Sequence, residues 1–418
     1  MEEFITVERA KEVILAGAVP LAPEKIAITA ALERVLAEDV VADMTIPPLD
    51  NSAMDGYALR AMDTSEAAAD QPLRMPVVGE IPAGRQFAGC LQPGDAVRIM
   101  TGAPIPTGAD AVIRREYVQE SKNYITLVEP VPLGNDIRYA GEDVRRGETI
   151  IAAGAVLTPA MIGMMAAVGL PFAAVIRQPR VAVLATGDEL VDFNEPPTAG
   201  RIRNSNSYSL AALVKHAGGV PIVFPVTGDD PDLLRQRVEQ AATAADLVLT
   251  TGGVSMGDYD FVKTVLNEVS GGVHFWKVRM KPGKPLVYGA VAGTPLVGLP
   301  GNPVSVMISF EQFVRPLIKK MLGYPPSAWF LPRLTAIAGE EMPIARGRRY
   351  FLRGVATQTP QGLTTVVTTG PQGSGILRSM VVSNCLVVLN EGDEPVKKGS
   401  PVEIELLDYG CSTIVAGR

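Results

Sequence analysis

The sequence predicts a multidomain α/β protein whose central domain is built on a parallel β-sheet. Three apolar segments, 181–184, 221–225 and 247–249, are each followed by a Thr-Gly pair and then by acidic residues. Amphipathic helical stretches lie between them, and this alternation of strands and helices is typical of a parallel sheet. Short β-forming runs between Pro- and Gly-rich loops on both sides indicate further domains of β type.

The N-terminal domain is predicted to be helical and to consist of two pieces, residues 1–46 and 144–178. Residues 7–16 and 25–39 have the apolar spacing of two amphipathic helices. The segment that separates the two pieces is expected to be an insertion into this domain.

An uncharged stretch over residues 149–176 invites a membrane interpretation. However, Thr158-Pro159 is a typical helix start, and Gly169-Leu170-Pro171 is a typical stop. The helix between them has about ten residues, and about 20 are needed to span a bilayer. We therefore predict a strand, a buried helix and a strand, and no membrane segment. The acidic N-terminus is not a signal peptide.

The inserted segment, residues 47–143, is predicted to be a small β-domain, because β-forming runs at 96–99, 111–113 and 124–128 alternate with loops. The central α/β domain is expected over 179–326 and a C-terminal β-domain over 327–418. Helices of the central domain are predicted at 207–217, 232–244 and 260–269, with a long one after Asn302-Pro303. Strands of the C-terminal domain are predicted at 350–353, 364–368, 386–389 and 402–406.

The composition restricts the possible functions. The chain has 418 residues, of which 47% are apolar, so several domains with substantial cores are expected. Its net charge of -7 excludes the basic footprint of a nucleic-acid-binding protein. Three cysteines without metal-ligand spacing and only two histidines argue against a zinc site or a disulfide framework. A reducing cytoplasm fits this cysteine usage.

Acidic residues are predicted to gather at one edge of the central sheet. Ligands of open α/β sheets bind outside the carboxyl ends of the strands, which is where the acidic residues follow the Thr-Gly pairs. These are Asp188 and Glu189, Asp229 and Asp230, and Asp258 and Asp260. Clustered carboxylates there suggest Mg²⁺, which usually shares its coordination shell with substrate phosphates.

Two further motifs are typical of anion binding, although each has an ordinary structural explanation. Residues 299–303, Leu-Pro-Gly-Asn-Pro, read either as an anion site at a helix N-terminus or as a simple helix start. Lys277, Lys281 and Lys284 lie beside the end of the predicted strand 274–276, and they read either as phosphate contacts or as a solvated loop. Both alternatives remain open for each motif.

One motif points to a different chemistry. Gly253-Val-Ser255-Met-Gly257 matches the nucleophile elbow of α/β hydrolases. A catalytic triad then needs a histidine further along the chain. His274 alone follows, close in sequence and inside a predicted strand. The hydrolase interpretation is therefore disfavoured.

The ordered set of motifs resembles the molybdopterin molybdenumtransferase family, the bacterial relatives of the E domain of gephyrin. The resemblance covers nearly the whole chain. It rests on these segments: Asp50-Asn-Ser-Ala-Met-Asp-Gly-Tyr-Ala58, Arg98-Ile-Met-Thr-Gly-Ala-Pro104, Gly141-Glu-Asp143, Thr186-Gly-Asp-Glu-Leu190, Thr251-Gly-Gly-Val-Ser-Met-Gly257, Lys281-Pro-Gly-Lys-Pro285, Leu299-Pro-Gly-Asn-Pro303, Gly373-Ser-Gly375 and Asn384-Cys385.

The resemblance implies a function and an assembly. The function is Mg²⁺-dependent insertion of molybdate into adenylylated molybdopterin with release of AMP. The assembly is a homodimer in which the α/β domain of one subunit and the N-terminal part of the other share a cleft. It also implies a barrel-like C-terminal domain and, as a further partner, the molybdopterin adenylyltransferase.

The resemblance also assigns site residues by motif. The residues given catalytic roles are Asp55, Thr101, Asp143, Glu189, Asp229 and Asp260, of which the last three are the candidate metal ligands. Residues expected to bind substrate or anion are Arg138, Thr186, Gly252, Gly253, Ser255, Lys277, Lys281, Lys284, Pro300, Gly301, Asn302, Pro303, Arg353 and Ser374.

Two alternative functions are kept beside this one. The first is an enzyme like the molybdopterin adenylyltransferase, which shares the α/β fold but normally lacks the additional β-domains. The second is a non-catalytic scaffold like gephyrin, which would not need the complete set of carboxylates.

Overall fold

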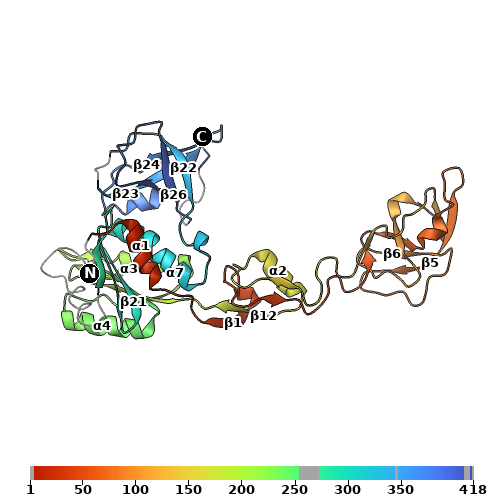
Figure 1. Cartoon of the computed structure of the whole chain (residues 1–418), viewed down its shortest axis with the longest axis horizontal. Coiled ribbons are helices and arrows are strands. Elements are labelled where there is room, and N and C mark those ends of the chain that lie inside the picture. The colour runs from red at the N-terminus through yellow and green to blue at the C-terminus, as the bar shows by residue number, and fades with distance from the viewer. Residues whose placement is uncertain (1–3, 254–272, 344–346, 409–414, 417–418) are drawn as a thin grey trace. The chain divides into compact units, whose positions relative to one another are not determined.

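The computed structural model describes residues 4–253, 273–343, 347–408 and 415–416. The chain forms two compact units, whose residues can be followed with the colour bar of Figure 1. The large unit is Met1–Glu24 with Ala174–Arg418, and the small unit is Lys25–Ala173. The boundaries of the four predicted domains stay a prediction.

A six-stranded sheet forms the centre of the large unit, in the order β16-β13-β17-β21-β20-β18. Its strands are β13 (Arg180–Ala185), β16 (Val220–Val223), β17 (Leu247–Thr251), β18 (Val273–Lys277), β20 (Pro285–Val291) and β21 (Thr294–Leu299). The three strands predicted to be parallel pair in parallel, and β21 joins them. Strands β20 and β18 run antiparallel, so the sheet as a whole is mixed.

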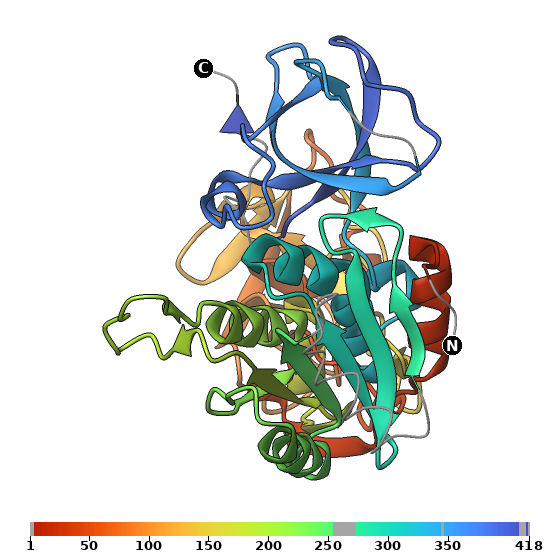
Figure 2. The same cartoon turned by 90° about the vertical axis from the view of Figure 1, so that its left-hand side faces the viewer.

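Helices cover both faces of this sheet (Figure 2). Along β13, Val181 and Val183 pack in one core with α1 (Val7–Ala16) and α3 (Asn206–Ala217). Ala182 and Leu184 face the other way and pack with α4 (Pro231–Ala244), as the two-residue period of a strand requires. The predicted helices at 7–16, 207–217 and 232–244 are confirmed. The helix predicted over 260–269 lies outside the described residues.

The long helix predicted after Asn302-Pro303 is present but irregular. It consists of α6 (Pro303–Ser309), a π-helical turn (Phe310–Val314) and α7 (Arg315–Met321). Pro316 lies in the second position of α7. It has no N–H to donate to the preceding turn, and its ring would clash with a carbonyl of a regular α-helix there. The wider π turn just before it relieves this conflict.

The C-terminal part of the large unit is a closed five-stranded barrel, which confirms the predicted barrel-like domain. Its strands pair in the circular order β23-β24-β22-β26-β25 and back to β23. They are β22 (Arg333–Ala338), β23 (Arg349–Gln358), β24 (Thr364–Thr368), β25 (Cys385–Leu389) and β26 (Pro401–Leu406). Strands β19 (Met280–Lys281) and β27 (Val415–Ala416) also pair with β23, and helix α8 (Arg378–Val382) precedes β25.

The small unit contains the predicted β-domain as a six-stranded sheet in the order β7-β4-β6-β5-β9-β8. These strands are β4 (Gly56–Leu59), β5 (Leu73–Ile81), β6 (Ala96–Ile99), β7 (Ala111–Arg114), β8 (Gln119–Glu120) and β9 (Tyr124–Leu127). Short two-stranded ladders join the remaining segments: β1 (Pro23–Ala27) with β12 (Phe172–Ile176), β2 (Val40–Val41) with β11 (Thr149–Ile151), and β3 (Asn51–Ser52) with β10 (Ile137–Arg138).

The helix predicted over residues 25–39 is wrong. Strand β1 and a single 3-10 turn, Ile28–Ala30, begin this segment. The rest pairs with a distant part of the chain: Glu33 N–H donates to the carbonyl of Leu157 (2.9 Å) and Leu36 N–H to that of Ala155 (2.9 Å). This pairing overrides the helical propensity of the sequence.

Helix α2 (Pro159–Ala167) has the predicted start, since the Thr158 hydroxyl accepts from the N–H of Met161. The prediction that this helix is buried is wrong for the single chain, in which Met165 is the only buried residue of the helix. The helix is therefore strongly apolar and largely uncovered. Among the residues that the structure describes, no helix is long and apolar enough to cross a membrane.

Candidate functional site

The three Thr-Gly loops lie side by side at the carboxyl edge of the central sheet, as the strand pattern predicted. Thr186 forms a parallel bridge with Thr227, and the N–H of Gly187 donates to the carbonyl of Thr227 (3.2 Å). On the other side, the N–H of Thr186 donates to the carbonyl of Thr251 (3.0 Å). The loop at 186–189 is thus held between the other two.

Gly252 allows the closest approach between these loops. A Cβ atom on Gly252 would lie 2.3 Å from the carbonyl oxygen of Thr186, and its φ of +90° is in the left-handed region. We therefore expect Gly252→Ala to displace the loops and to lower activity at least about tenfold, with a loss of about 1–3 kcal/mol in stability. Melting temperature and turnover measure the two effects.

Gly301 provides the matched control, because it lies against the same loop but has room for a methyl group. Its added Cβ would meet only the Cα of Gly252, at 3.8 Å. Gly301→Ala should therefore change stability little. Equal effects of the two alanine substitutions would contradict the steric explanation.

Two of the three predicted metal ligands lie on these loops. Glu189 and Asp229 are exposed at the ends of β13 and β16. Their loops are joined directly, because the N–H of Asp229 donates to Oδ1 of Asp188 (3.1 Å). Asp260, the third predicted ligand, lies outside the described residues, as does Ser255 of the neighbouring motif.

These carboxylates are suitable donors for Mg²⁺. Among the described residues, no group of three or more His, Cys, Asp or Glu side chains is placed to hold a metal ion. Mg²⁺ is usually bound through only one or two carboxylates, together with waters and substrate phosphates. The exposed oxygens of Glu189 and Asp229 on adjoining loops fit that requirement.

A fourth loop, residues 300–303, joins the same edge through Thr251 and Asn206. The Thr251 hydroxyl donates to the carbonyl of Pro300 (3.0 Å). The amide of Asn206 donates to that hydroxyl (3.0 Å) and to the carbonyl of Gly301 (2.8 Å). Sequence reasoning missed Asn206, whose only signal was its place at the start of the helix after the first Thr-Gly loop.

A cavity of about 740 Å³ lies between this loop, the Lys-Pro-Gly-Lys loop and the barrel, all within the large unit. It brings together predicted anion-binding residues from three segments. These are Lys281, Lys284, Asn302, Arg353 and Ser374. Arg348 and Gln372 also line the cavity and were not predicted. Among the described residues, Lys277 and the other residues predicted at the sheet edge do not line it.

Arg353 supplies a buried positive charge to the wall of this cavity. It has 0% exposed surface, and among the described residues no carboxylate forms an ion pair with it. Burial lowers the pKa of the guanidinium to about 10, so it remains charged at neutral pH. Its Nη1 has no hydrogen-bond partner in the described part of the chain. An uncompensated buried charge is costly, so this group favours an anionic ligand.

The helix start at Asn302-Pro303 begins α6, and its role in anion binding stays a prediction. Asn302 makes no side-chain cap hydrogen bond to another described residue. The N–H of Val304, one of the free donors of the first turn, is already bonded to the carbonyl of Ser374 (3.1 Å). The helix start therefore anchors the barrel loop through this donor.

Four of the predicted site residues, Asp55, Thr101, Arg138 and Asp143, lie in the small unit. Oδ1 of Asp55 accepts from both the N–H (2.8 Å) and the hydroxyl (2.7 Å) of Thr101. The Thr101 N–H is the largest cause that lowers the pKa of Asp55. Arg138 lies opposite Asn51 in the β3–β10 ladder, and the N–H of Asp143 donates to the carbonyl of Ile46 (3.2 Å). Asp55 and Thr101 are thus in direct contact.

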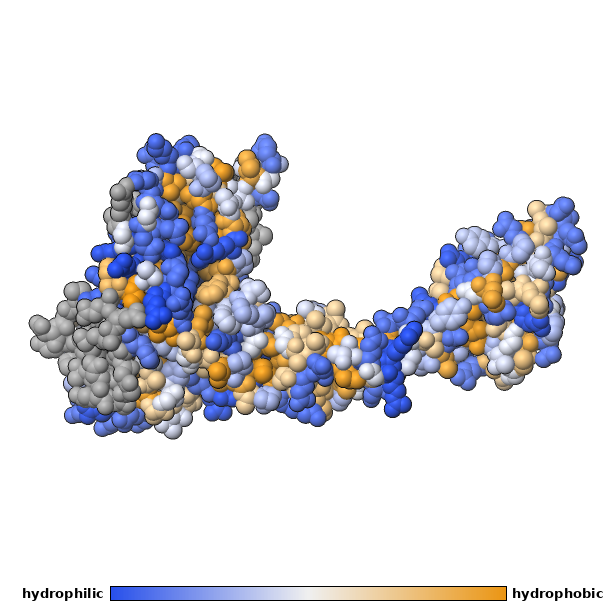
Figure 3. Space-filling model, viewed as in Figure 1, coloured by the Kyte–Doolittle hydropathy of each residue, from blue (hydrophilic) through white to orange (hydrophobic). Residues whose placement is uncertain are grey.

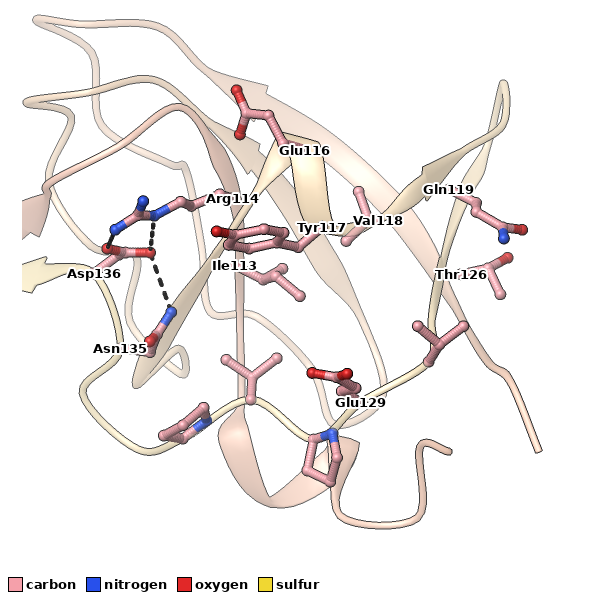
Figure 4. Close-up of a pocket in the computed structure, with 14 residues that line it drawn as sticks. Ile113, Arg114, Glu116, Tyr117, Val118, Gln119, Thr126, Glu129, Asn135 and Asp136 are labelled. Atoms are coloured by element: carbon pink, nitrogen blue, oxygen red, sulfur yellow. Dashed lines mark hydrogen bonds and ion pairs between the residues drawn. The ribbon is translucent and has the colours of Figure 1, made fainter. Parts of the chain in front are cut away.

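A second cavity, of about 610 Å³, lies in the β-domain of the small unit and is shown in Figure 4. Arg114 pairs there with Asp136 at 2.9 Å, and Asn135 donates to Asp136 (3.2 Å). Tyr117 and Glu129 also line it. It contains none of the predicted site residues, so we do not assign the chemistry to it.

Family models match three parts of the chain. The model described as "MoeA N-terminal region (domain I and II)" matches residues 5–169. "Probable molybdopterin binding domain" matches 182–320, and "MoeA C-terminal region (domain IV)" matches 335–407.

Individual relatives match over nearly the full length. Identity to a molybdopterin molybdenumtransferase 2 of Mycobacterium tuberculosis is 40%, over 91% of this chain and 94% of the relative. Identity to the molybdopterin molybdenumtransferase of Haemophilus influenzae is 38%, over 93% and 95%. A crystal structure of the molybdopterin biosynthesis moeA protein from Pyrococcus horikoshii OT3 superimposes with a TM-score of 0.82 at 32% identity, over 97% of this chain and 100% of that one.

Proposed function

The chain belongs to the molybdopterin molybdenumtransferase family, and we propose that it inserts molybdate into adenylylated molybdopterin in a Mg²⁺-dependent reaction that releases AMP. This reaction completes the molybdenum cofactor. The substrate carries a phosphoanhydride and the second reactant is a tetrahedral dianion, so the site must bind two kinds of anion.

The observation that carries this proposal is the cationic cavity beside the sheet edge. Lys281, Lys284 and the buried Arg353 face a space of about 740 Å³. A tetrahedral oxyanion would offer acceptors to several of these donors at once, and charge-assisted hydrogen bonds are the strongest of their kind. We propose that molybdate binds here, close to the loop at 300–303.

The sheet edge is proposed to hold the phosphoanhydride of the adenylylated substrate. Gly253, which has a left-handed φ of 63° and no side chain, would allow a ligand to approach the backbone closely. Glu189 and Asp229, with Asp260, are proposed to hold Mg²⁺. When bound, Mg²⁺ would polarise a phosphoryl oxygen and neutralise charge as AMP leaves. The carboxylates of the chain would orient the metal and the attacking group.

A homodimer is proposed because the N-terminal region has an apolar surface that no described part of the same chain covers. Helix α2 has one buried residue, and Leu32, Val41 and Phe172 in the same region are about half exposed. Figure 3 shows hydrophobic residues gathered over the segment that contains α2. An apolar surface of this kind is typical of a subunit interface. We propose that a second copy covers it and contributes its Asp55 and Thr101 to the cleft.

The deciding experiment measures AMP release from adenylylated molybdopterin with and without molybdate. Molybdate-stimulated release, with formation of the cofactor, would support the proposal. An adenylyltransferase-like enzyme would instead form the adenylylated compound from molybdopterin and ATP. A pure scaffold would release no AMP in either condition.

The two lysines of the cavity are expected to contact anions directly. Lys281→Ala and Lys284→Ala should each weaken molybdate binding by roughly ten- to a hundredfold, since each removes one charge-assisted hydrogen bond. Calorimetric titration with molybdate measures this effect. Lys398→Ala, in a barrel loop outside the cavity lining, is the charge-matched control. If molybdate affinity changes less than twofold in both cavity variants, the two lysines belong to a solvated loop and do not bind the anion.

A further inference from the structure

The three nitrogen atoms of the Arg353 guanidinium have different surroundings. Nε donates to the hydroxyl oxygen of Ser379 (3.0 Å), and Nη2 donates to the carbonyl of Gly373 (3.1 Å). Nη1 has no partner among the described residues. Because both partners are neutral, the guanidinium keeps its full charge for a ligand and is nevertheless fixed in orientation.

The Ser379 hydroxyl is set as an acceptor for Arg353. Its own hydrogen is used in a bond to the carbonyl of Ile376 (2.7 Å), one turn earlier in the chain. The remaining lone pairs of the oxygen therefore point to Nε of Arg353. Ser379 is itself buried, at 3% exposure, so water does not compete for this contact.

Gln372 fixes the other end of the same residue. Its side-chain oxygen accepts from the backbone N–H of Arg353 (2.9 Å), and its amide donates to the carbonyl of Gly370 (3.0 Å). Gly373, the next residue, accepts from the guanidinium. The loop at 370–374 therefore clamps Arg353 at both ends, while its Ser374 carbonyl binds Val304 at the start of α6.

We propose that Ser379 and Gln372 are positioning residues that aim the free Nη1 of Arg353 at the oxyanion in the cavity. This inference rests on the proposed molybdate site. Neither residue needs to touch the anion. Without them the guanidinium could turn toward other acceptors. Residues that orient the ligands of a metal site contribute about ten- to a hundredfold in affinity, and we expect an effect of similar size for this oriented guanidinium.

The test is a double-mutant cycle read by calorimetric titration with molybdate and, separately, tungstate. Ser379→Ala and Gln372→Ala should each weaken binding about tenfold, and Arg353→Leu about a hundredfold. If the serine acts through the arginine, Ser379→Ala should have no further effect in the Arg353→Leu background. In the AMP-release assay, Ser379→Ala should raise the KM for molybdate and leave kcat at saturation nearly unchanged.

Ser383→Ala is the matched control. Ser383 is also buried, and its hydroxyl also donates to the carbonyl three residues earlier, that of Met380 (3.0 Å), but it does not contact Arg353. This variant should bind molybdate as the wild type does. Any general loss of stability around α8 would appear in both serine variants.

The possible outcomes separate this inference from the function on which it rests. Unchanged binding in Arg353→Leu would overturn both the molybdate site and the positioning roles. Weak binding in Arg353→Leu with wild-type binding in Ser379→Ala and Gln372→Ala would overturn the positioning roles alone. Equal losses from Ser379→Ala in both backgrounds would show a structural effect and would also reject them. If Ser379→Ala does not fold, the cycle with Gln372→Ala decides in the same way.

Discussion

Replacing Asp229 with alanine is expected to raise the Mg²⁺ concentration for half-maximal activity by at least about tenfold. The exposed carboxylate lies on a loop that is bonded to the loop of Glu189, so its loss would remove one of the few protein oxygens offered to the metal. Loss of a coordinating or orienting contact at a metal site typically costs about ten- to a hundredfold. Glu189→Gln should act in the same direction. AMP release measured over a range of Mg²⁺ concentrations gives the Mg²⁺ concentration for half-maximal activity.

Asp232→Asn provides the control for charge. Asp232 lies only three residues further along, in the first turn of α4, and its highly exposed side chain pairs with Arg235 at 3.3 Å. This substitution removes the same charge from the same region and should leave the Mg²⁺ dependence unchanged. An unaltered dependence in both Asp229→Ala and Glu189→Gln would reject these residues as metal ligands.

The sheet edge was predictable because its information is local and periodic. A Thr-Gly pair follows each of the three apolar strands in the sequence. Because the strands are parallel, their carboxyl ends, and so the three Thr-Gly pairs, lie at the same edge of the sheet. The contacts among Thr186, Thr227 and Thr251 bear this out. The barrel strands were predictable for the same reason, since their β-forming runs are separated by clear turn residues.

The errors arise where distant contacts outweigh local propensity. Residues 25–39 have a helical pattern, but their backbone pairs with residues 155–157 instead. Helix α2 was predicted to be buried because its sequence is apolar, whereas within one chain it is mostly exposed. An apolar pattern says that a surface will be covered and does not say whether the same chain covers it.

The missed residues act through contacts that no local spacing reveals. Asn206 joins loops that lie 45 and 95 residues away from it. Ser379 and Gln372 lie 26 and 19 residues from the arginine that they hold. The family resemblance assigned Arg353 as a binding residue, and that assignment stays a prediction. Ser379 and Gln372, which accept hydrogen bonds from Arg353, lie outside the segments that carry the resemblance.

The exposed helix α2 and the separate group at Asp55 lead to the second prediction, which concerns the shared cleft. We expect Asp55→Ala and Asp229→Ala homodimers each to lose activity by at least about a hundredfold, as removal of one key polar group from an active site commonly does. In a heterodimer of the two variants, one cleft would combine the intact Asp55 of one subunit with the intact Asp229 of the other. The second cleft would carry both substitutions.

Co-expression with two separable tags should therefore yield a heterodimer with up to about half of the wild-type activity per dimer, because a two-fold symmetric interface builds two equivalent clefts. Each homodimer, purified by the same tags, is the control for contaminating activity. A heterodimer of wild-type and doubly substituted subunits should be nearly inactive, since each of its clefts would carry one lesion, although its composition in residues is the same. The two heterodimers contain the same number of intact Asp55 and Asp229 residues and differ only in which subunits carry them. A difference in activity therefore shows that the two residues act in one cleft from different subunits. An active wild-type and double-variant dimer beside an inactive Asp55→Ala and Asp229→Ala dimer would mean that each cleft is built within one chain.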